Sequence, residues 1–398
     1  MRNETQGGPR QLVFWLGGRM QNKGILALAI ALLMLPQIAQ TLYSPALADF
    51  GRAFSITPAV AAQALTVYFL AFAFGVVVWG RACDHFGRRA SMLCGLLLFA
   101  SASTAAIFVT SFRGLLLAQA CAAFGAAAGS VVTQTILRDR FGGSELARVF
   151  SIAGMFLATS PAVGLLAGAI AVHEYGYQGV MLFLVGIVCI MIIWTAAFLP
   201  ETMPRICVGT SLAETVRIMA GDLAIWRAAL LVAVFNVSLL GYYVLAPFLF
   251  RRLHQSDQVY GYSGAVLAVG ASTGSWLNQR LLRLGVHGEK IIAMASCLVL
   301  LGGIGVQASK DSIWFLAPML LVFIAFGLAI PNVLGKALGQ YQDRLGTAGA
   351  LFGLMYYLMI GAGLGWVSTC QDLGGSLIAS GLLALLLSLG RFAGWSTR

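Results

Sequence analysis

Charged residues are scarce in this chain, and none of its acidic residues falls in the middle of a long apolar run. Lys, Arg, Asp and Glu make up 10% of the 398 residues, whereas soluble domains carry about 25%. A water-soluble fold with 59% hydrophobic residues could not cover its surface with polar groups, so a soluble globular protein is excluded. All fourteen Asp and Glu and all four His lie in loops or at predicted helix ends. The apolar runs therefore hold no nucleophile–base pair and no metal-ligand cluster, and we expect no enzyme activity, no metal and no cofactor.

Paired cysteines are absent as well. The seven Cys are scattered singly along the chain, and none forms a C-x-x-C pair. Most of them lie in apolar runs, where a free Cys behaves as a small apolar residue. We therefore interpret them as structural thiols and not as a redox or metal site.

Apolar runs of membrane-spanning length fill most of the chain. A helix needs about 20 apolar residues to cross the hydrocarbon core. The sequence predicts an all-α membrane protein with twelve transmembrane helices, over 24–46, 59–81, 90–109, 113–136, 148–172, 178–199, 225–249, 260–280, 290–308, 313–338, 346–369 and 374–394.

The net charge of +11 is explained by topology and not by a nucleic-acid partner. If the N-terminus is cytoplasmic, twenty of the 25 Lys and Arg fall on the inner side of the membrane and five on the outer side. Such an excess of inner basic residues sets the orientation of membrane proteins. We expect a multi-pass protein of the bacterial inner membrane, with both termini in the cytoplasm.

One polar linker divides the predicted spans into two halves. Residues 200–224 separate six spans, within 24–199, from six more, within 225–398. We interpret the halves as two pseudo-symmetric six-helix bundles, and duplicated halves of this kind place a substrate site at their interface. Residues 1–23 form a cytoplasmic N-terminal segment, and its apolar insert is equally compatible with a surface helix and with disorder.

The loop between the second and third spans carries the most specific motif. Residues 80–89 read Gly-Arg-Ala-Cys-Asp-His-Phe-Gly-Arg-Arg, which resembles the G-x-x-x-D-x-x-G-R-R signature of the major facilitator superfamily. The resemblance implies a conformational latch, in which Asp84 pairs with Arg138 or Arg140 and meets the start of span eleven at Gly346 and Thr347. A plain inner-side anchor is the alternative. The predicted latch residues are Gly80, Asp84, Gly87, Arg88, Arg89 and Arg138.

Further motifs resemble the bicyclomycin-resistance subgroup of the drug:proton antiporters. They are Tyr-Ser-Pro-Ala-Leu at 43–47, Leu-Pro-Glu-Thr at 199–202, Ala-Pro-Phe at 246–248 and Gly-Thr-Ala-Gly-Ala-Leu-Phe-Gly at 346–353. Span five carries Pro161, Gly164 and Gly168, which resemble a partial antiporter motif in which Pro and Gly bend the helix and close a leak path. An ordinary proline kink is the alternative for these three residues.

The chain departs from this subgroup at two embedded positions. Thr41 stands where the subgroup usually has an acid in span one, and Gln119 where it has an Arg in span four. Embedded charges cost several kcal/mol and are kept only for use, so the usual proton route is not carried over to this chain. Asp49 and Glu174, at the outer rim, are the substitutes that remain.

Uncharged polar residues remain as candidates for a substrate cavity. Gln37, Gln40, Thr41 and Ser44 recur at helical spacing on one face of span one. Amides and hydroxyls facing lipid are costly, so this face lines either a cavity or another helix. Weaker candidates, which are equally compatible with packing, are Gln63, Gln119, Asn236, Tyr243 and Tyr356.

These observations predict a secondary active transporter that exports a small organic compound, a drug or a metabolite, by alternating access. The resemblance implies export of the multidrug type, and the neutral cavity candidates favour a neutral or weakly charged substrate. A dedicated metabolite or siderophore exporter, an uncoupled facilitator and a non-transporting sensor are the alternatives. We expect a small-molecule substrate and membrane lipid as partners, no nucleic acid, and a monomer.

Overall fold

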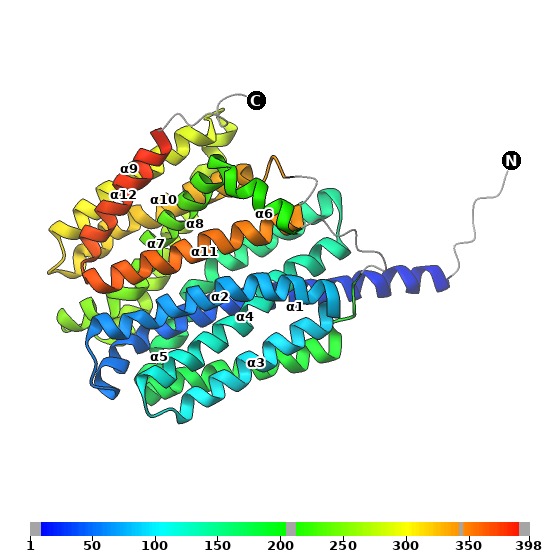
Figure 1. Cartoon of the computed structure of the whole chain (residues 1–398), viewed down its shortest axis with the longest axis horizontal. Helices are drawn as coiled ribbons and strands as arrows, with labels where there is room; N and C mark the ends of the chain where they lie inside the picture. Colours follow the sequence, from blue (N-terminus) through cyan, green and yellow to red (C-terminus); the bar gives the residue numbers. More distant parts are fainter. Residues whose placement is uncertain (1–8, 204–211, 342–344, 390–398) are drawn as a thin grey trace.

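The chain is almost entirely helical in a computed structural model, which describes residues 9–203, 212–341 and 345–389. No strand occurs among those residues, and the long helices run roughly alongside one another (Figure 1). The helices are α1 Pro9–Ala53, α2 Pro58–Phe86, α3 Arg88–Phe108, α4 Phe112–Arg140, α5 Gly143–Phe198, α6 Leu212–Gly221, α7 Leu223–Arg252, α8 Asp257–Arg283, α9 Gly288–Ala308, α10 Leu316–Ala337, α11 Leu345–Cys370 and α12 Leu373–Leu389, with a 3₁₀ turn at Ile313–Phe315.

The twelve predicted spans all correspond to helices of the structure. Within the described ranges, nine helices are long and apolar enough to cross a membrane. One of them, α5, holds two predicted spans, because its backbone leaves the helical region only at Gly176, where φ is +61°. The remaining two predicted spans are α8, which is less apolar, and α12, which is shorter. The prediction of an all-α membrane protein with twelve transmembrane helices is confirmed.

Polar side chains begin several helices. Thr57 accepts a hydrogen bond from the Val60 N–H at the start of α2, and Ser111 and Ser256 cap α4 and α8 in the same way. These caps satisfy N–H groups that have no partner inside the helix, which fixes where each span begins.

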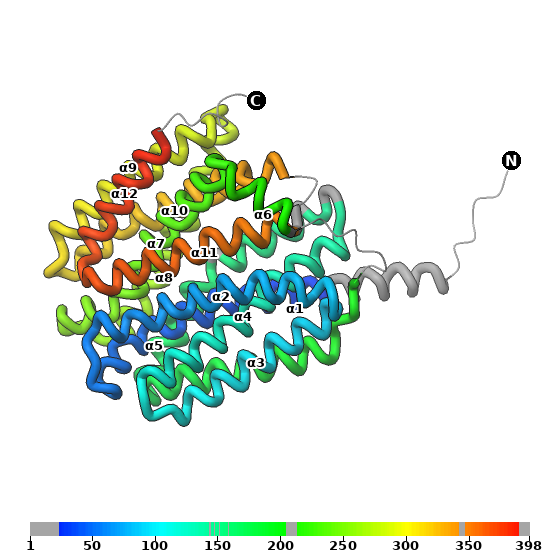
Figure 2. Tube along the Cα trace, in the orientation of Figure 1, coloured from blue at the N-terminus to red at the C-terminus, as the bar shows by residue number. Residues whose placement is uncertain are grey.

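The helices form two bundles that meet along their length. The first contains α1 to α5 and the second α7 to α12, and Figures 1 and 2 show these as a blue-to-green half and a green-to-red half. Packing of α2 against α11, and of α5 against α8, joins the halves. The short helix α6, which sequence analysis did not predict, lies in the 200–224 segment and contacts α7 and α11.

Close backbone contact holds the first bundle together. A Cβ atom on Gly168 of α5 would lie 2.5 Å from the Leu42 carbonyl oxygen of α1, and one on Gly164 would lie 2.7 Å from the Ile38 carbonyl oxygen. Helices in lipid associate through small residues of this kind.

The two ends of the molecule are named here by one residue each. The Gly87 end carries the α2–α3 corner and the start of α7, and the Asp49 end carries the turns after α1 and after α7.

Candidate functional site

The α2–α3 corner at Gly87 is built for glycine. Gly87 has a φ of +92°, which side chains other than glycine rarely adopt. A Cβ atom there would also lie 2.5 Å from an oxygen of Glu201. The predicted latch motif therefore contains, at its eighth position, a turn whose backbone conformation favours glycine and where a side chain would displace the Glu201 carboxylate.

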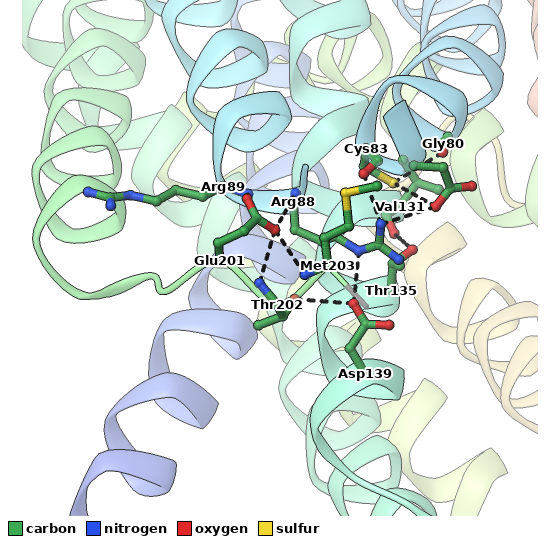
Figure 3. Close-up of polar contacts among 11 residues, drawn as sticks. Gly80, Cys83, Arg88, Arg89, Val131, Thr135, Asp139, Glu201, Thr202 and Met203 are labelled. Carbon is green, nitrogen blue, oxygen red and sulfur yellow. Dashed lines mark hydrogen bonds and ion pairs between the residues drawn. The ribbon is translucent and has the colours of Figure 1, made fainter. Parts of the chain in front are cut away.

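Glu201 caps the helix that starts at this corner. Its carboxylate accepts hydrogen bonds from the backbone N–H of Arg88, at 2.8 Å, and of Arg89, at 3.1 Å (Figure 3). The N–H groups of Thr202 and Met203 donate to the same carboxylate. Burial raises the pKa of Glu201, but the four N–H donors lower the pKa by more than burial raises it. The pKa of Glu201 therefore lies below its ordinary value.

Arg88 is the buried centre of the corner, with 3% of its surface exposed. Its Nε donates to Asp139 of α4 at 2.8 Å, and its Nη1 donates to the Cys83 carbonyl oxygen at 2.9 Å. The same Nη1 lies 3.4 Å from Asp84. Thr202 donates its hydroxyl to Asp139 as well. One guanidinium therefore ties together α2, α3 and α4, and Asp139 links it to the segment after α5.

Arg89 points the other way from the same helix start. Its Nη2 donates to the Ala196 carbonyl oxygen at 2.6 Å, near the end of α5. The carbonyl groups of a last helical turn lack partners inside the helix, so a cation is favourable there. Figure 3 shows Arg88 and Arg89 extending in opposite directions from the corner.

Arg138 does not take the place that the sequence predicted for it. Its guanidinium lies 5.8 Å from the ring centre of Phe150 on α5, within the first bundle. Asp84 instead makes its ion pair with Arg88, and 58% of the Asp84 side chain is exposed. Pairing of Asp84 with Arg138 or Arg140 is thus not seen among the described side chains of this conformation, and it stays a prediction for the state in which the Gly87 end is closed. Contact of Asp84 with the start of span eleven stays a prediction.

Sequence reasoning missed two carboxylates of this site, Asp139 and Glu201. Asp139 lies between the two arginines that were considered as partners, and Glu201 lies in the Leu-Pro-Glu-Thr motif. The Leu-Pro-Glu-Thr motif thus pointed to Glu201, but the motif alone did not indicate that the Glu201 carboxylate caps α3.

The cavity candidates on α1 are mostly packed against other helices. The Gln40 amide donates to the Gln37 side chain, and the Thr41 hydroxyl donates to the Gln37 carbonyl oxygen at 2.9 Å. Thr41 is 1% exposed and lies directly against Gly164 of α5. Ser44 is fully buried and donates to the Tyr243 carbonyl oxygen of α7, with Tyr260 Oη of α8 at 2.5 Å. In this conformation Thr41 and Ser44 fill helix–helix contacts, which is the second of the two arrangements that the sequence allowed, and lining of a cavity by them stays a prediction.

The remaining candidates are spread over several helices. Gln119 is 1% exposed, and neither its amide nitrogen nor its amide oxygen has a hydrogen-bond partner. The Asn236 amide donates to the Val232 carbonyl oxygen of its own helix. Tyr243 is buried, and Gln63 is exposed. The half-buried Tyr356 ring lies 4.4 Å from the Tyr357 ring and 5.3 Å from Phe352. The structure brings Ser44 and Tyr243 together across the two bundles.

The predicted helix-bend residues lie in a continuous helical stretch of α5. Pro161 lies inside α5, and the backbone stays helical through Gly164 and Gly168. Both glycines lie against the backbone of α1. The non-helical position in α5 is Gly176, eight residues beyond Gly168. A bend at this motif remains a prediction, whereas its close approach to α1 is observed.

Comparison with known proteins identifies the family. The family model of the Major Facilitator Superfamily matches residues 27–365. The chain belongs to this superfamily. Its proteins are membrane transporters and not enzymes, so the expected lack of enzyme activity agrees with the family.

Individual members of the superfamily cover nearly the whole chain. An uncharacterized transporter from Rickettsia bellii is 29% identical over 84% of this chain and 86% of its own. Multidrug resistance protein D from Escherichia coli is 25% identical over the same shares. A bicyclomycin resistance protein homolog from Haemophilus influenzae is 24% identical over 86% of this chain and 87% of its own. The predicted resemblance to drug-resistance members is confirmed.

A solved structure supports the fold independently. The crystal structure of a D-xylose-proton symporter superposes with a TM-score of 0.75 and covers 92% of this chain and 96% of its own. Its sequence is 14% identical, so the likeness concerns the fold. Together with the apolar helices, it establishes a multi-pass membrane protein with the major facilitator fold.

Proposed function

We propose that this protein exports a small organic compound across the bacterial inner membrane by alternating access. Membership of the Major Facilitator Superfamily supports transport, and relatives named for multidrug and bicyclomycin resistance support export of the drug type. In this proposal, residues 24–199 and 225–398 are the two moving bundles and 200–224 is the linker. The twenty basic residues on the side of the termini support cytoplasmic termini, which makes the Gly87 end the inner end.

A difference between the two ends of the molecule carries the proposal. At the Asp49 end, Arg251 of the second bundle lies 2.6 Å from Asp49 of the first, and Ser44 bonds to α7 and α8. At the Gly87 end, the ion pairs of Arg88 with Asp84 and Asp139 stay within the first bundle. Bundles fastened to each other at one end and separately braced at the other are what an inward-facing intermediate of alternating access requires.

The corner at Gly87 supplies the other half of this cycle in our proposal. Arg88 and Glu201 brace the corner inside the first bundle, which leaves the exposed Asp84 available to the second bundle. When the Gly87 end closes, Asp84 engages the opposite bundle and stabilises the outward-facing state. Closure then depends on a carboxylate that contributes little to the stability of the inward-facing state.

A neutral or weakly charged substrate fits the candidate cavity residues best. Charged residues among the described side chains lie at helix ends, in loops or, for Glu174, beside the Gly176 kink of α5, and Gln119 and Thr41 are uncharged. A buried amide without partners costs free energy, about 1–3 kcal/mol, and Gln119 presents both a donor and an acceptor. We propose that Gln119 hydrogen-bonds substrate once the surrounding helices separate.

Efflux from pump-deficient bacteria tests the proposal. Cells expressing the protein would be loaded with the cation ethidium or with the neutral dye Nile red, with and without a protonophore. Efflux of Nile red that Asp84→Asn reduces at equal membrane expression is the expected result. Efflux of neither dye above the Asp84→Asn background, at confirmed expression, would count against a broad drug exporter and favour a dedicated metabolite carrier.

An uncoupled facilitator is the second candidate function. The observation that favours it is the loss of charge at positions 41 and 119, where Thr41 packs against α5 and Gln119 is neutral. Transport that is insensitive to the protonophore and stops when substrate is equal on both sides would identify a facilitator. Protonophore-sensitive accumulation against a gradient would exclude it.

A further inference from the structure

We propose that Asp49 and Arg251 form a charge lock that closes the Asp49 end, and that this lock opens by exchange of partners. Each residue has a second opposite charge in its own bundle, Arg52 for Asp49 and Asp257 for Arg251. The inference rests on the proposed alternating-access function, because a lock between bundles has a role only if the bundles separate.

The contacts of Asp49 show why it holds the two bundles together. Its side chain is 11% exposed, and its Oδ1 accepts a hydrogen bond from Arg251 Nη2 of α7 at 2.6 Å. The same oxygen also accepts from Arg52, three residues along α1. Ion pairs with such limited solvent access are screened less than surface pairs, so the contact to α7 contributes to closure.

Arg251 has its own second partner on the other side. Its Nη2 lies 3.6 Å from Asp257 Oδ1, at the first turn of α8. The four charges alternate in sign and are drawn from both bundles, so the cluster is neutral as a whole. Arg251 thus contacts two carboxylates, and Asp49 contacts two arginines.

A second layer of contacts lies deeper along α1. Ser44, five residues before Asp49, donates to the Tyr243 carbonyl oxygen and lies 2.5 Å from the Tyr260 hydroxyl oxygen. The Tyr260 ring in turn packs 5.1 Å from Phe250. Because the ion pairs lie nearer the end of the molecule, water reaches them before it reaches this layer. The charge lock is thus the first contact that separation of the bundles has to break.

Partner exchange keeps the free-energy cost of separating the two bundles small. Breaking Asp49 from Arg251 leaves Asp49 with Arg52, since both belong to α1, and leaves Arg251 with Asp257, since α7 and α8 belong to the same bundle. A partly buried charge that loses its only partner is strongly destabilising. The two states therefore stay close in free energy, which a two-state device needs if small ligands are to shift it.

The labelling rate of a buried cysteine tests the lock without any substrate. Ala48 on α1 is 6% exposed, so Ala48→Cys, in a chain with the seven native Cys replaced, reacts with a maleimide only when the Asp49 end opens. Arg251→Gln and Asp49→Asn should raise this rate about fivefold, and Arg251→Lys should keep it near the rate of the parent. Asp257→Asn should lower it about twofold, because Arg251 then depends on Asp49 alone.

Arg252→Gln is the matched control. Arg252 is the next residue along α7, and it pairs with Asp311 at 3.2 Å inside the second bundle. The Arg252→Gln substitution should leave the labelling rate of Ala48→Cys unchanged. Equal rates for Arg251→Gln, Asp49→Asn and Arg252→Gln would overturn the lock, and a raised rate for Asp257→Asn would overturn partner exchange. Failure of the dye efflux together with the expected labelling pattern would refute the proposed export and leave the lock standing.

Discussion

The backbone N–H of Arg88 donates to Glu201 at 2.8 Å, across 113 residues of the chain. This bond joins the start of the third span to the segment that follows the sixth, so that both edges of the first bundle are fixed at one corner. The first two predictions concern this corner and the turn that makes it possible.

Gly87→Ala should lower the stability of the protein more than Gly285→Ala does. Both glycines have positive φ, +92° and +80°, and both precede a helix of their own bundle. An added Cβ at Gly87 meets Glu201 at 2.5 Å, whereas one at Gly285 meets nothing within 4 Å. The strain from φ alone costs about 1–3 kcal/mol, and the clash adds to it only at Gly87. Thermal unfolding of the purified variants in detergent measures the difference, and equal melting temperatures would contradict it.

Glu201→Gln should remove part of the acid sensitivity of the protein. The pKa of Glu201 is below its ordinary value in the folded state, so the carboxylate stabilises the fold at pH values above its unfolded pKa of about 4.3. That stabilisation is lost as the pH falls through the lower, folded pKa. Melting temperatures recorded from neutral pH into this acid window should therefore converge for Glu201→Gln and the unmodified protein. Parallel curves at all pH values would show that Glu201 contributes nothing through its charge.

Much of the fold was predictable because lipid imposes it. Apolar runs of span length correspond to every transmembrane helix, including the two that α5 joins across Gly176. The pairing of Asp84 with Arg88 at the corner was not predictable. Asp84 and Arg138 carry the right charges, but side-chain direction and burial decide which cation a carboxylate meets, and in this conformation Asp84 pairs with Arg88. The short helix α6 also escaped prediction, because its ten residues are too few to show a clear period.

At Thr41 and Ser44 the sequence left open both a cavity and a helix contact, for a different reason. Helical spacing correctly placed them on one face of α1, but spacing cannot tell a cavity from a neighbouring helix. Gly164, which has no side chain, lets α5 approach until Thr41 is buried. The decisive information thus lay in a residue more than a hundred positions away.

Arg88→Met should be strongly destabilising, by about 3–5 kcal/mol, because it leaves Asp139 without its buried partner. Asp139→Asn should cost less, since the Cys83 carbonyl oxygen and Asp84 still receive the guanidinium. The double variant should lose less stability than the sum of the two single losses. A double-mutant cycle of chemical or thermal unfolding checks this, and strictly additive losses would rule out the pairing.

Gln119→Leu should stabilise the fold and weaken transport. The Gln119 amide is buried without a partner, so replacing it with an apolar side chain of similar size removes a desolvation cost of about 1–3 kcal/mol. The same change removes the hydrogen-bonding group that we propose for substrate. Melting temperature and dye efflux, measured on the same preparation, should move in opposite directions. A rise in both would remove Gln119 from the substrate site.

Gly168→Ala should disturb the first bundle, because its Cβ would lie 2.5 Å from the backbone of α1. Gly186→Ala, further along α5 where a Cβ meets nothing within 4 Å, is the control. We expect lower yield of folded, monodisperse protein for Gly168→Ala by size-exclusion chromatography and no change for the control. Equal yields would mean that α1 and α5 can separate at this point without loss.

The contact of Ser44 with α7 has a genetic consequence. Because its acceptor there is the carbonyl oxygen of Tyr243, most amino-acid replacements at position 243 leave that acceptor in place. A selection for mutants in which the Asp49 end opens more readily should therefore recover codon changes at Ser44 and Tyr260, whose side chains make the contact. Substitutions at position 243 would be recovered only where they change the packing of its ring. Such mutants should therefore be more frequent at Ser44 of α1 than at Tyr243 of α7.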